Sequence, residues 1–275
     1  MMADKVKVLT VDGLAYYHTK VKKAIEDEAK YSNAKPIVEP IGGIEVGETF
    51  DNVPIVDMLT KLLYPYIKPI VSTMVATATG GVFEKGTSVD ITAMSVIVGK
   101  KSSPLSKVEF INGSTVVDTI TEGLPESGTA TIKSTKAFSL TTDTTLSAKA
   151  YDSEEVPGST TVKGPSYAFV DPIFYGPANS DTELNSDAIN DLNKVIEVKG
   201  EKKAFVYNLD EQKAVFAYPK SYGKLTQIID PNGFDVTDTF DVLEVTVTVK
   251  SGDVPYYVYA TDPTIVDDFK FTFVY

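Results

Sequence analysis

The chain ends in the stretch Phe269-Lys270-Phe271-Thr272-Phe273-Val274-Tyr275, in which aromatic side chains occupy alternate positions. Successive side chains of a β-strand point to opposite faces, so the three phenylalanines share one face of the predicted strand. We expect that face to lie in a hydrophobic core. The last two residues either dock on the same module or pair with a neighbouring molecule. This stretch therefore predicts a β-module that the chain closes with its own end.

The segment before this strand repeats the pattern of strand and turn. Asp230-Pro231-Asn232-Gly233 carries proline and glycine at the positions that a type I turn favours. A helix is expected at about residues 186–196, inside a polar insertion. Further strands are expected at residues 203–208, 214–218, 225–229, 242–250 and 256–260. Residues 166–275 therefore predict a C-terminal β-sandwich module with a helical insertion.

Residues 69–165 also alternate with the period of two that is typical of strands. Asn112-Gly113 separates two alternating runs, and this pair is the strongest short hairpin signal. Gly80-Gly81 and Ser127-Gly128 indicate further turns. Short strands at this spacing predict an immunoglobulin-like (Ig-like) β-sandwich. The chain has no cysteine and no tryptophan, the landmarks of antibody domains, so the prediction concerns architecture alone.

Residues 1–68 differ in character and predict a helical attachment region with a linker. Asp12 is a suitable N-cap for a first amphipathic helix, and three acidic residues at 26–28 oppose its dipole. Such a helix needs a partner surface, either in the same chain or in another subunit. The candidate interface residues on this helix are Leu14, Tyr17, His18, Val21 and Ile25.

A second helix is expected after a linker at residues 31–52, which proline and glycine punctuate. Pro54 suits its first turn and Pro65 ends it. Its apolar side chains cover more than one stripe, so we expect this short helix to be buried. The whole chain is thus expected to be mainly β, with two short N-terminal helices before the two sandwiches.

The composition excludes several classes of function. Hydrophobic residues make up 43% and charged residues 23%, as in globular proteins. A net charge of −12 argues against nucleic-acid binding, which needs clustered Lys and Arg. The absence of cysteine excludes disulfides, thiol catalysis and cysteine-based zinc sites. No secretion signal and no apolar run long enough for a membrane helix is apparent, so we expect synthesis in a cytoplasm and no membrane insertion.

Catalytic constellations are equally scarce. His18 is the only histidine, so zinc sites that need two or three histidines are ruled out. Asp235, Asp238 and Asp241 follow the Asp230 turn, and a calcium site there competes with a plain acidic loop. A carboxylate pair of a glycosidase remains an alternative that sequence alone does not exclude. The expectation is a protein without enzymatic activity, catalytic residues, cofactor or required metal.

Both ends of the chain resemble known proteins. The segment from Val8 to Lys22, with its Asp12-Gly13-Leu14 helix start, is similar to the opening of many bacteriophage tail and tail-fibre proteins. Gly47–Phe50 with the following helix resembles a linker helix of phage virion proteins that precedes an Ig-like module. The C-terminal third resembles the last module of the same proteins. The resemblance implies a virion structural protein of the tail, baseplate or fibre type, present in several copies.

This family supplies no catalytic residues. It implies contacts with other virion proteins and with copies of the same chain, as in a homo-oligomer, and contact with a host-surface glycan or protein. Tyr256, Tyr257 and Tyr259 are candidates for adhesive contacts, because tyrosine gives contact area at low entropic cost. The alternatives are a capsid decoration or head-fibre protein, a carbohydrate-binding adhesion module, and a cell-wall hydrolase.

Overall fold

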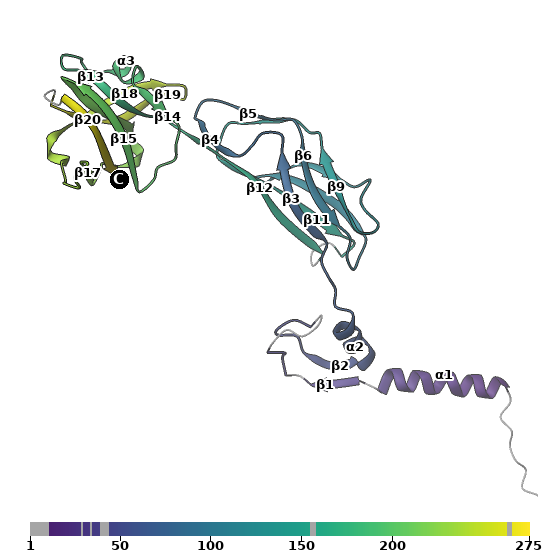
Figure 1. The fold of residues 1–275 in the computed structure, drawn as a ribbon. Helices are drawn as coiled ribbons and strands as arrows, with labels where there is room; N and C mark the ends of the chain where they lie inside the picture. The colour runs from purple at the N-terminus through teal and green to yellow at the C-terminus, as the bar shows by residue number, and fades with distance from the viewer. Residues whose placement is uncertain (1–10, 29, 34, 39–43, 155–157, 263–265) are drawn as a thin grey trace, which may run out of the picture. The chain divides into compact units, whose positions relative to one another are not determined.

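The computed structural model describes residues 11–28, 30–33, 35–38, 44–154, 158–262 and 266–275 (Figure 1). These residues divide into two compact units, Met1–Lys68 and Pro69–Tyr275. Strands make up most of the second unit, where they form two β-sandwich modules, each with its own core. The mainly β fold class expected from the alternating sequence is confirmed.

The N-terminal unit contains two helices and one small sheet. Helix α1 spans Val11–Glu28 and helix α2 spans Ile55–Leu63. Strands β1 (Lys30–Asn33) and β2 (Phe50–Pro54) pair antiparallel, within the segment expected to be a linker. The described buried apolar side chains of this unit are Ile44 and Phe50. The described part of this unit therefore contains only a very small core.

The first sandwich packs a three-stranded sheet on a five-stranded sheet. The small sheet has the order β3-β6-β9 and the large one β4-β12-β11-β7-β8, while β5 and β10 form a separate pair. The strands are β3 (Ile70–Ala76), β4 (Gly81–Glu84), β5 (Val89–Ile91), β6 (Met94–Gly99), β7 (Leu105–Asn112), β8 (Thr115–Ile120), β9 (Thr129–Ser134), β10 (Phe138–Leu140), β11 (Thr144–Asp152) and β12 (Ser159–Val170). Val96 and Val98 of β6 share one core with Phe110 of β7 and Leu146 of β11. The Asn112-Gly113 hairpin between β7 and β8 is confirmed.

Strand β12 runs without a break through the expected module boundary between residues 165 and 166. Tyr167 and Phe169 belong to the core of the first sandwich. Ile173 is the first residue that packs in the core of the second. The chain therefore passes from one core to the other at Asp171-Pro172, because the alternation of β12 continues beyond the turn-like residues near Gly164.

The second sandwich combines a five-stranded sheet, β14-β13-β16-β19-β18, with a three-stranded sheet, β15-β20-β17. Its elements are β13 (Ile173–Asn179), α3 (Ser186–Asn190), β14 (Asn193–Val195), β15 (Lys202–Asp210), β16 (Gln212–Pro219), the 3₁₀ turns η1 (Lys220–Tyr222) and η2 (Thr237–Thr239), β17 (Gln227–Ile229), β18 (Phe240–Val249), β19 (Gly252–Thr261) and β20 (Val266–Val274). Phe271 and Phe273 of β20 are buried and Phe269 packs at the edge of the same core. The core position predicted for the final strand is confirmed.

The central strands β16 and β19 of the five-stranded sheet are covered on both faces. Phe216 and Tyr259 face the three-stranded sheet, whereas Val215 and Val258 face a second cluster that contains Ile189 of α3. Helix α3 ends at Asn190 and β14 follows at once, so the helix is shorter than the expected 186–196. Among the described helices, none combines the length and the apolar character of a membrane span.

Candidate docking surface

Helix α2 is held against the N-terminal unit by its polar side. Lys61 Nζ lies 2.7 Å from Glu48 Oε2, and this hydrogen bond lowers the pKa of the Glu48 carboxyl below its usual value. The same ammonium group sits 5.8 Å from the centre of the buried Phe50 ring. Met58 and Leu62 are half-buried on the neighbouring side of the helix. These contacts fix which side of α2 turns away from the unit.

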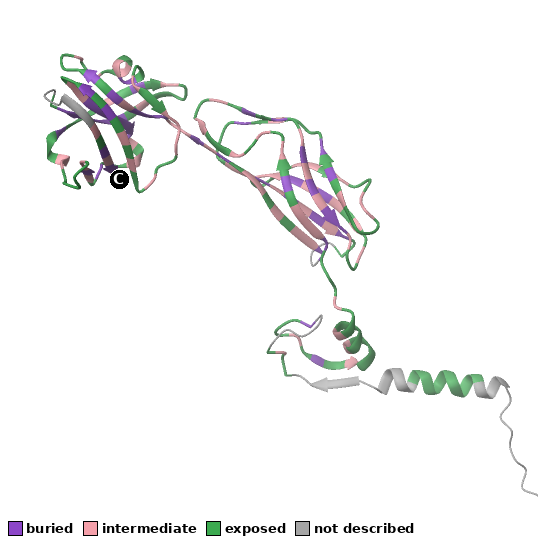
Figure 2. Cartoon of the chain, viewed as in Figure 1, coloured by how far each residue is buried: buried purple, intermediate pink, exposed green. Residues whose placement is uncertain are grey.

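The side that turns away is apolar. Val56, Leu59 and Leu63 follow one another at helical spacing, and their exposed fractions are 62%, 45% and 68%. Figure 2 shows most of α2 in the colour of exposed residues. We refer to these three residues as the α2 face. The expectation that this helix would be buried is wrong, because none of its residues is buried within the chain. Among the side chains that the structure describes in this unit, the buried apolar ones are Ile44 and Phe50, and Phe50 packs away from the α2 face.

Helix α1 adds further exposed side chains to the same unit. Of the five predicted interface residues, Tyr17, His18 and Val21 are exposed. The side chains of Leu14 and Ile25 lie outside those that the structure describes. The structure places Tyr17 and Val21 one turn apart on this helix, with no described side chain covering them. The prediction that these residues form an interface stays a prediction.

An exposed apolar helix face is a candidate binding surface, and the α2 face is one in the described part of the N-terminal unit. A unit of this size rarely folds stably on so small a core, and it needs a partner, a metal or cross-links. Covering a side chain that is about half exposed is worth roughly 1 kcal/mol, since full burial is worth about 1.5–3 kcal/mol. The three residues of the α2 face thus offer a partner a few kcal/mol of binding free energy. The apolar pattern of residues 55–63 predicts this helix, but it does not reveal that Val56, Leu59 and Leu63 face outward.

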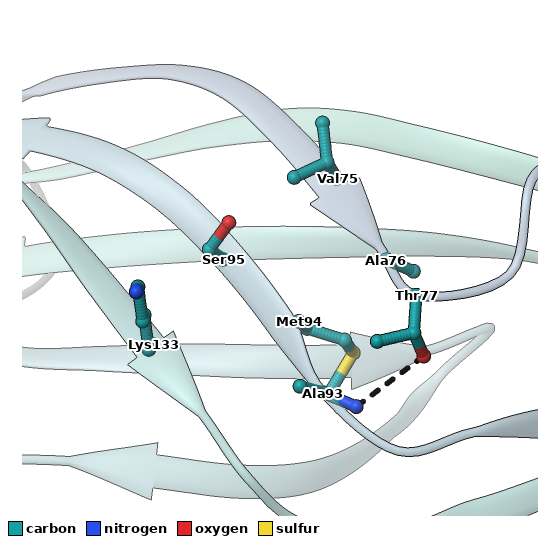
Figure 3. Close-up of a pocket in the computed structure, with 7 residues that line it drawn as sticks. All are labelled: Val75, Ala76, Thr77, Ala93, Met94, Ser95 and Lys133. Atoms are coloured by element: carbon teal, nitrogen blue, oxygen red, sulfur yellow. Dashed lines mark hydrogen bonds between the residues drawn. The ribbon is translucent and has the colours of Figure 1, made fainter.

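Figure 3 shows one of the hollows on the first sandwich. It encloses about 240 Å³ and is lined mainly by small or aliphatic side chains, with Lys133 as the charged member (Figure 3). Thr77 Oγ1 accepts a hydrogen bond from Ala93 N at 3.4 Å, so this hydroxyl is engaged by the backbone. The residues that line the hollow supply no carboxylate or imidazole to act as a base. The arrangement suits neither nucleophilic nor acid–base catalysis.

The acidic loop that was a calcium candidate uses its carboxylates locally. Asp230 Oδ1 accepts backbone hydrogen bonds from Asn232 and Phe234 at 2.9 and 2.8 Å. Asp235 Oδ1 accepts from the amide and hydroxyl of Thr237, which lowers the pKa of this carboxyl. Within the described residues, no three acidic or histidine side chains gather as metal ligands would. Turn formation accounts for the hydrogen bonds of Asp230 and Asp235.

The adhesive role considered for the C-terminal tyrosines is wrong. Tyr256, Tyr257 and Tyr259 are buried, and Tyr256 donates a hydrogen bond from its hydroxyl to the carbonyl of Pro172 at 2.8 Å. Their positions alternate between the two faces of the five-stranded sheet, and both faces are covered. The exposed aromatic of this module is Phe234 at the tip of the acidic loop. Sequence alternation alone did not reveal that the sheet is buried on both sides.

Comparison with known proteins adds little to this geometry. No model of a protein family matches the sequence, and no curated protein does either. Among solved structures, the fibronectin(III)-like modules of CbhA from Clostridium thermocellum align at 19% identity. The alignment covers 70% of this chain and 78% of that chain with a TM-score of 0.21. A TM-score this low defines neither fold nor function, so the fold class rests on the sheet topology.

Proposed function

We propose that this chain is a structural component of a bacteriophage virion, associated with the tail, baseplate or fibres. In this role, the N-terminal unit docks on other virion proteins, and the two β-sandwiches serve assembly or contact with the host surface. The role is not enzymatic and requires no cofactor. The protein is made in the host cytoplasm and resides in the particle.

The observation that carries the proposal is the α2 face. An apolar helix side that the described residues of its own unit leave exposed is expected where a chain binds another protein. Its position in the N-terminal unit agrees with the resemblance of this region to the attachment ends of phage tail proteins. The resemblance supports the assignment of this chain to a virion. The α2 face supports the proposal that the chain docks through residues 1–68.

The test replaces two residues of the α2 face by charges. We expect Leu59→Glu with Leu63→Glu to abolish incorporation of the full chain into particles, because two buried carboxylates would oppose docking. The matched control is Val116→Glu with Val206→Glu, which places the same charges on exposed valines of the two sandwiches. Particles are purified from complemented lysates, and the protein is quantified by immunoblot. Normal incorporation of the α2 variant would refute the docking role.

Immunogold labelling of intact particles separates the two virion locations. Antibody against residues 166–275 should label the tail end. Gold over the head would replace the tail assignment by capsid decoration. Absence of gold from every particle, with the antigen expressed and reactive, would refute an exposed virion role altogether.

A further inference from the structure

Strand β18 is an edge strand without the usual protection against pairing. It ends the order β14-β13-β16-β19-β18, so one of its sides has no neighbouring strand in that sheet. It is ten residues long and pairs with β19 without any shift in register. Its sequence contains no lysine, no proline and no glycine. Natural edge strands are commonly short, bulged or charged with lysine to prevent association.

The other edges of the second sandwich are protected. At the opposite side of the same sheet, β14 has only three residues. In the smaller sheet, β17 is equally short, and β15 begins with Lys202 and Lys203. Strand β18 is therefore the long, regular and lysine-free edge of this module.

Helix α3 covers one end of this edge and leaves the rest open. Thr248 donates its N–H to Ser186 Oγ at 3.0 Å, and its carbonyl accepts from Asn190 Nδ2 at 3.1 Å. Both backbone groups of Thr248 thus point away from β19. In an antiparallel pair these directions alternate along the strand. The backbone groups of Val242, Glu244 and Thr246 therefore point to the open edge as well.

Each face of the open stretch carries one exposed apolar side chain beside an exposed carboxylate, that of Asp241 on one face and that of Glu244 on the other. Val242 and Leu243 point to opposite faces and each is 44% exposed. A cavity of about 370 Å³ lies beside Asp241–Leu243, bounded on its other side by residues 182–184. The cavity leaves room for a side chain of an added strand next to Leu243.

From this edge we infer that a second copy of the chain pairs with β18, antiparallel and about a two-fold axis at Leu243. The inference does not rest on the proposed virion role. In a two-fold pair, the residues whose backbone groups point to the open edge must lie opposite one another in the two copies. This requirement allows few registers. A centre at Glu244 sets two carboxylates opposite one another, which is unfavourable even though each accepts a hydrogen bond from its own Lys220. With the two-fold axis at Val245, Val242 of one copy would pair with Thr248 of the other. The backbone groups of Thr248 already form hydrogen bonds with α3.

The two-fold register at Leu243 avoids both obstacles. It pairs residues 240–246 of one copy with 246–240 of the other, and so uses the open stretch and nothing beyond it. Val242 then hydrogen-bonds with Glu244 of the second copy, and Leu243 faces Leu243 across the axis. With the two-fold axis at Val242, Thr246 of one copy would instead lie opposite Asp238 of the other, which belongs to the 3₁₀ turn η2. The result joins the two five-stranded sheets into one continuous sheet, a form of β-augmentation.

The absence of native cysteine permits a direct test. Leu243 and its symmetry mate form a non-hydrogen-bonded pair, whose Cα separation of about 4.5 Å suits a disulfide. We expect full-length Leu243→Cys to form covalent dimers under a mild oxidant. Val206→Cys, on the exposed side of β15, is the control for random collision. Dimer formation no faster than in this control would overturn the inference.

The cysteine test is made in the chain that also carries Leu59→Glu and Leu63→Glu, so that association through the α2 face does not contribute. A second variant, Val242→Pro, removes an outward N–H and leaves the bonds to β19 in place. We expect it to weaken self-association, measured by sedimentation equilibrium, about tenfold or more. A Val242→Pro protein that is folded and still dimerises as the parent does would also overturn the inference.

Discussion

The side-chain amide of Asn190 donates to the carbonyl of Thr248 at 3.1 Å, so the last α-helix of the chain caps the end of an edge strand. The same amide donates to the carbonyl of Ser186 at 3.0 Å, which fixes its orientation. The helix itself is capped by Asn185, whose side-chain oxygen accepts from the backbone N–H groups of Asp187 and Ala188. A five-residue helix is thus used to close part of a sheet edge.

We predict that Asn190→Ala lowers the free energy of unfolding by about 1 kcal/mol and increases self-association. The loss follows from one or two removed hydrogen bonds. The gain in association follows because the freed carbonyl of Thr248 opens the two-fold register at Val245 in addition to that at Leu243. Urea unfolding and sedimentation velocity measure the two effects. The control is Thr131→Ala on an exposed position of β9, which should change neither. An unchanged oligomeric state together with the expected loss of stability would show that the cap is structural only.

A second prediction concerns pH and the group around Glu109. Lys107 Nζ donates to Glu109 Oε1 at 2.8 Å, and the hydroxyl of Tyr151 donates to Oε2 at 2.9 Å. Burial alone would raise the pKa of this carboxyl, but the two hydrogen bonds outweigh it and hold the pKa below its usual value. The bonded carboxylate therefore stabilises the folded state above the unfolded pKa of about 4.3. This contribution is lost as the pH falls through the lower, folded pKa.

Glu109→Gln should reduce the free energy of unfolding by about 1 kcal/mol at pH 7, since part of the hydrogen bonding is screened by solvent. At a pH below the folded pKa of Glu109, where the carboxyl is protonated, the difference from the parent should shrink. Urea titrations at both pH values provide the measurement. Glu122→Gln on an exposed turn is the control and should follow the parent throughout. A difference that is constant with pH would refute the role assigned to the charge.

The third prediction concerns the aromatic core of the second sandwich. The rings of Phe216 and Phe273 stack with centroids 4.0 Å apart, and neither side chain is exposed. Phe273→Ala should therefore cost about 3–5 kcal/mol. The same substitution at Phe234, which is 68% exposed, should stay within about 0.5 kcal/mol of the parent. Equal losses at the two positions, measured by urea unfolding, would contradict the placement of the final strand in the core.

Sequence alone predicted those elements whose pattern is local. The alternating phenylalanines of residues 269–275 and the Asn112-Gly113 turn each specify their structure within a few residues. The burial of both faces of Ala214–Pro219 and Tyr256–Ala260 depends instead on a helix and a second sheet that pack from elsewhere in the chain. Alternation then carries no information about exposure. For this reason the sequence does not predict that Tyr256, Tyr257 and Tyr259 are buried.

The outward position of the α2 face could not be predicted from the sequence for a related reason. The apolar pattern of α2 indicates that the helix seeks apolar contacts, but it does not say whether these lie inside the chain or on a partner. Only the positions of Glu48 and Phe50, which hold Lys61, reveal which side faces outward. Likewise, the unprotected edge of β18 depends on strand order, which no segment of the sequence encodes by itself.

Two adjacent glycines give the last prediction. The sequence Gly80-Gly81 predicts an ordinary turn. In the structure, however, a Cβ atom on Gly80 would lie 2.6 Å from the backbone carbonyl oxygen of Ser166. A Cβ atom on Gly81 would meet nothing closer than the ring of Phe83 at 3.9 Å. Gly80 is therefore required by the close approach of the chain to β12, while Gly81 is not.

Gly80→Ala should destabilise the first sandwich by about 1–3 kcal/mol, because a backbone atom cannot yield as a flexible side chain does. Gly81→Ala should stay within about 1 kcal/mol of the parent, since the added methyl group makes an ordinary contact. Urea unfolding of the two full-length variants, followed by circular dichroism, compares positions that differ in this one contact. If both substitutions lower the free energy of unfolding equally, the close approach of Ser166 does not constrain this turn. The backbone that pairs β4 with β12 would then be free to move aside.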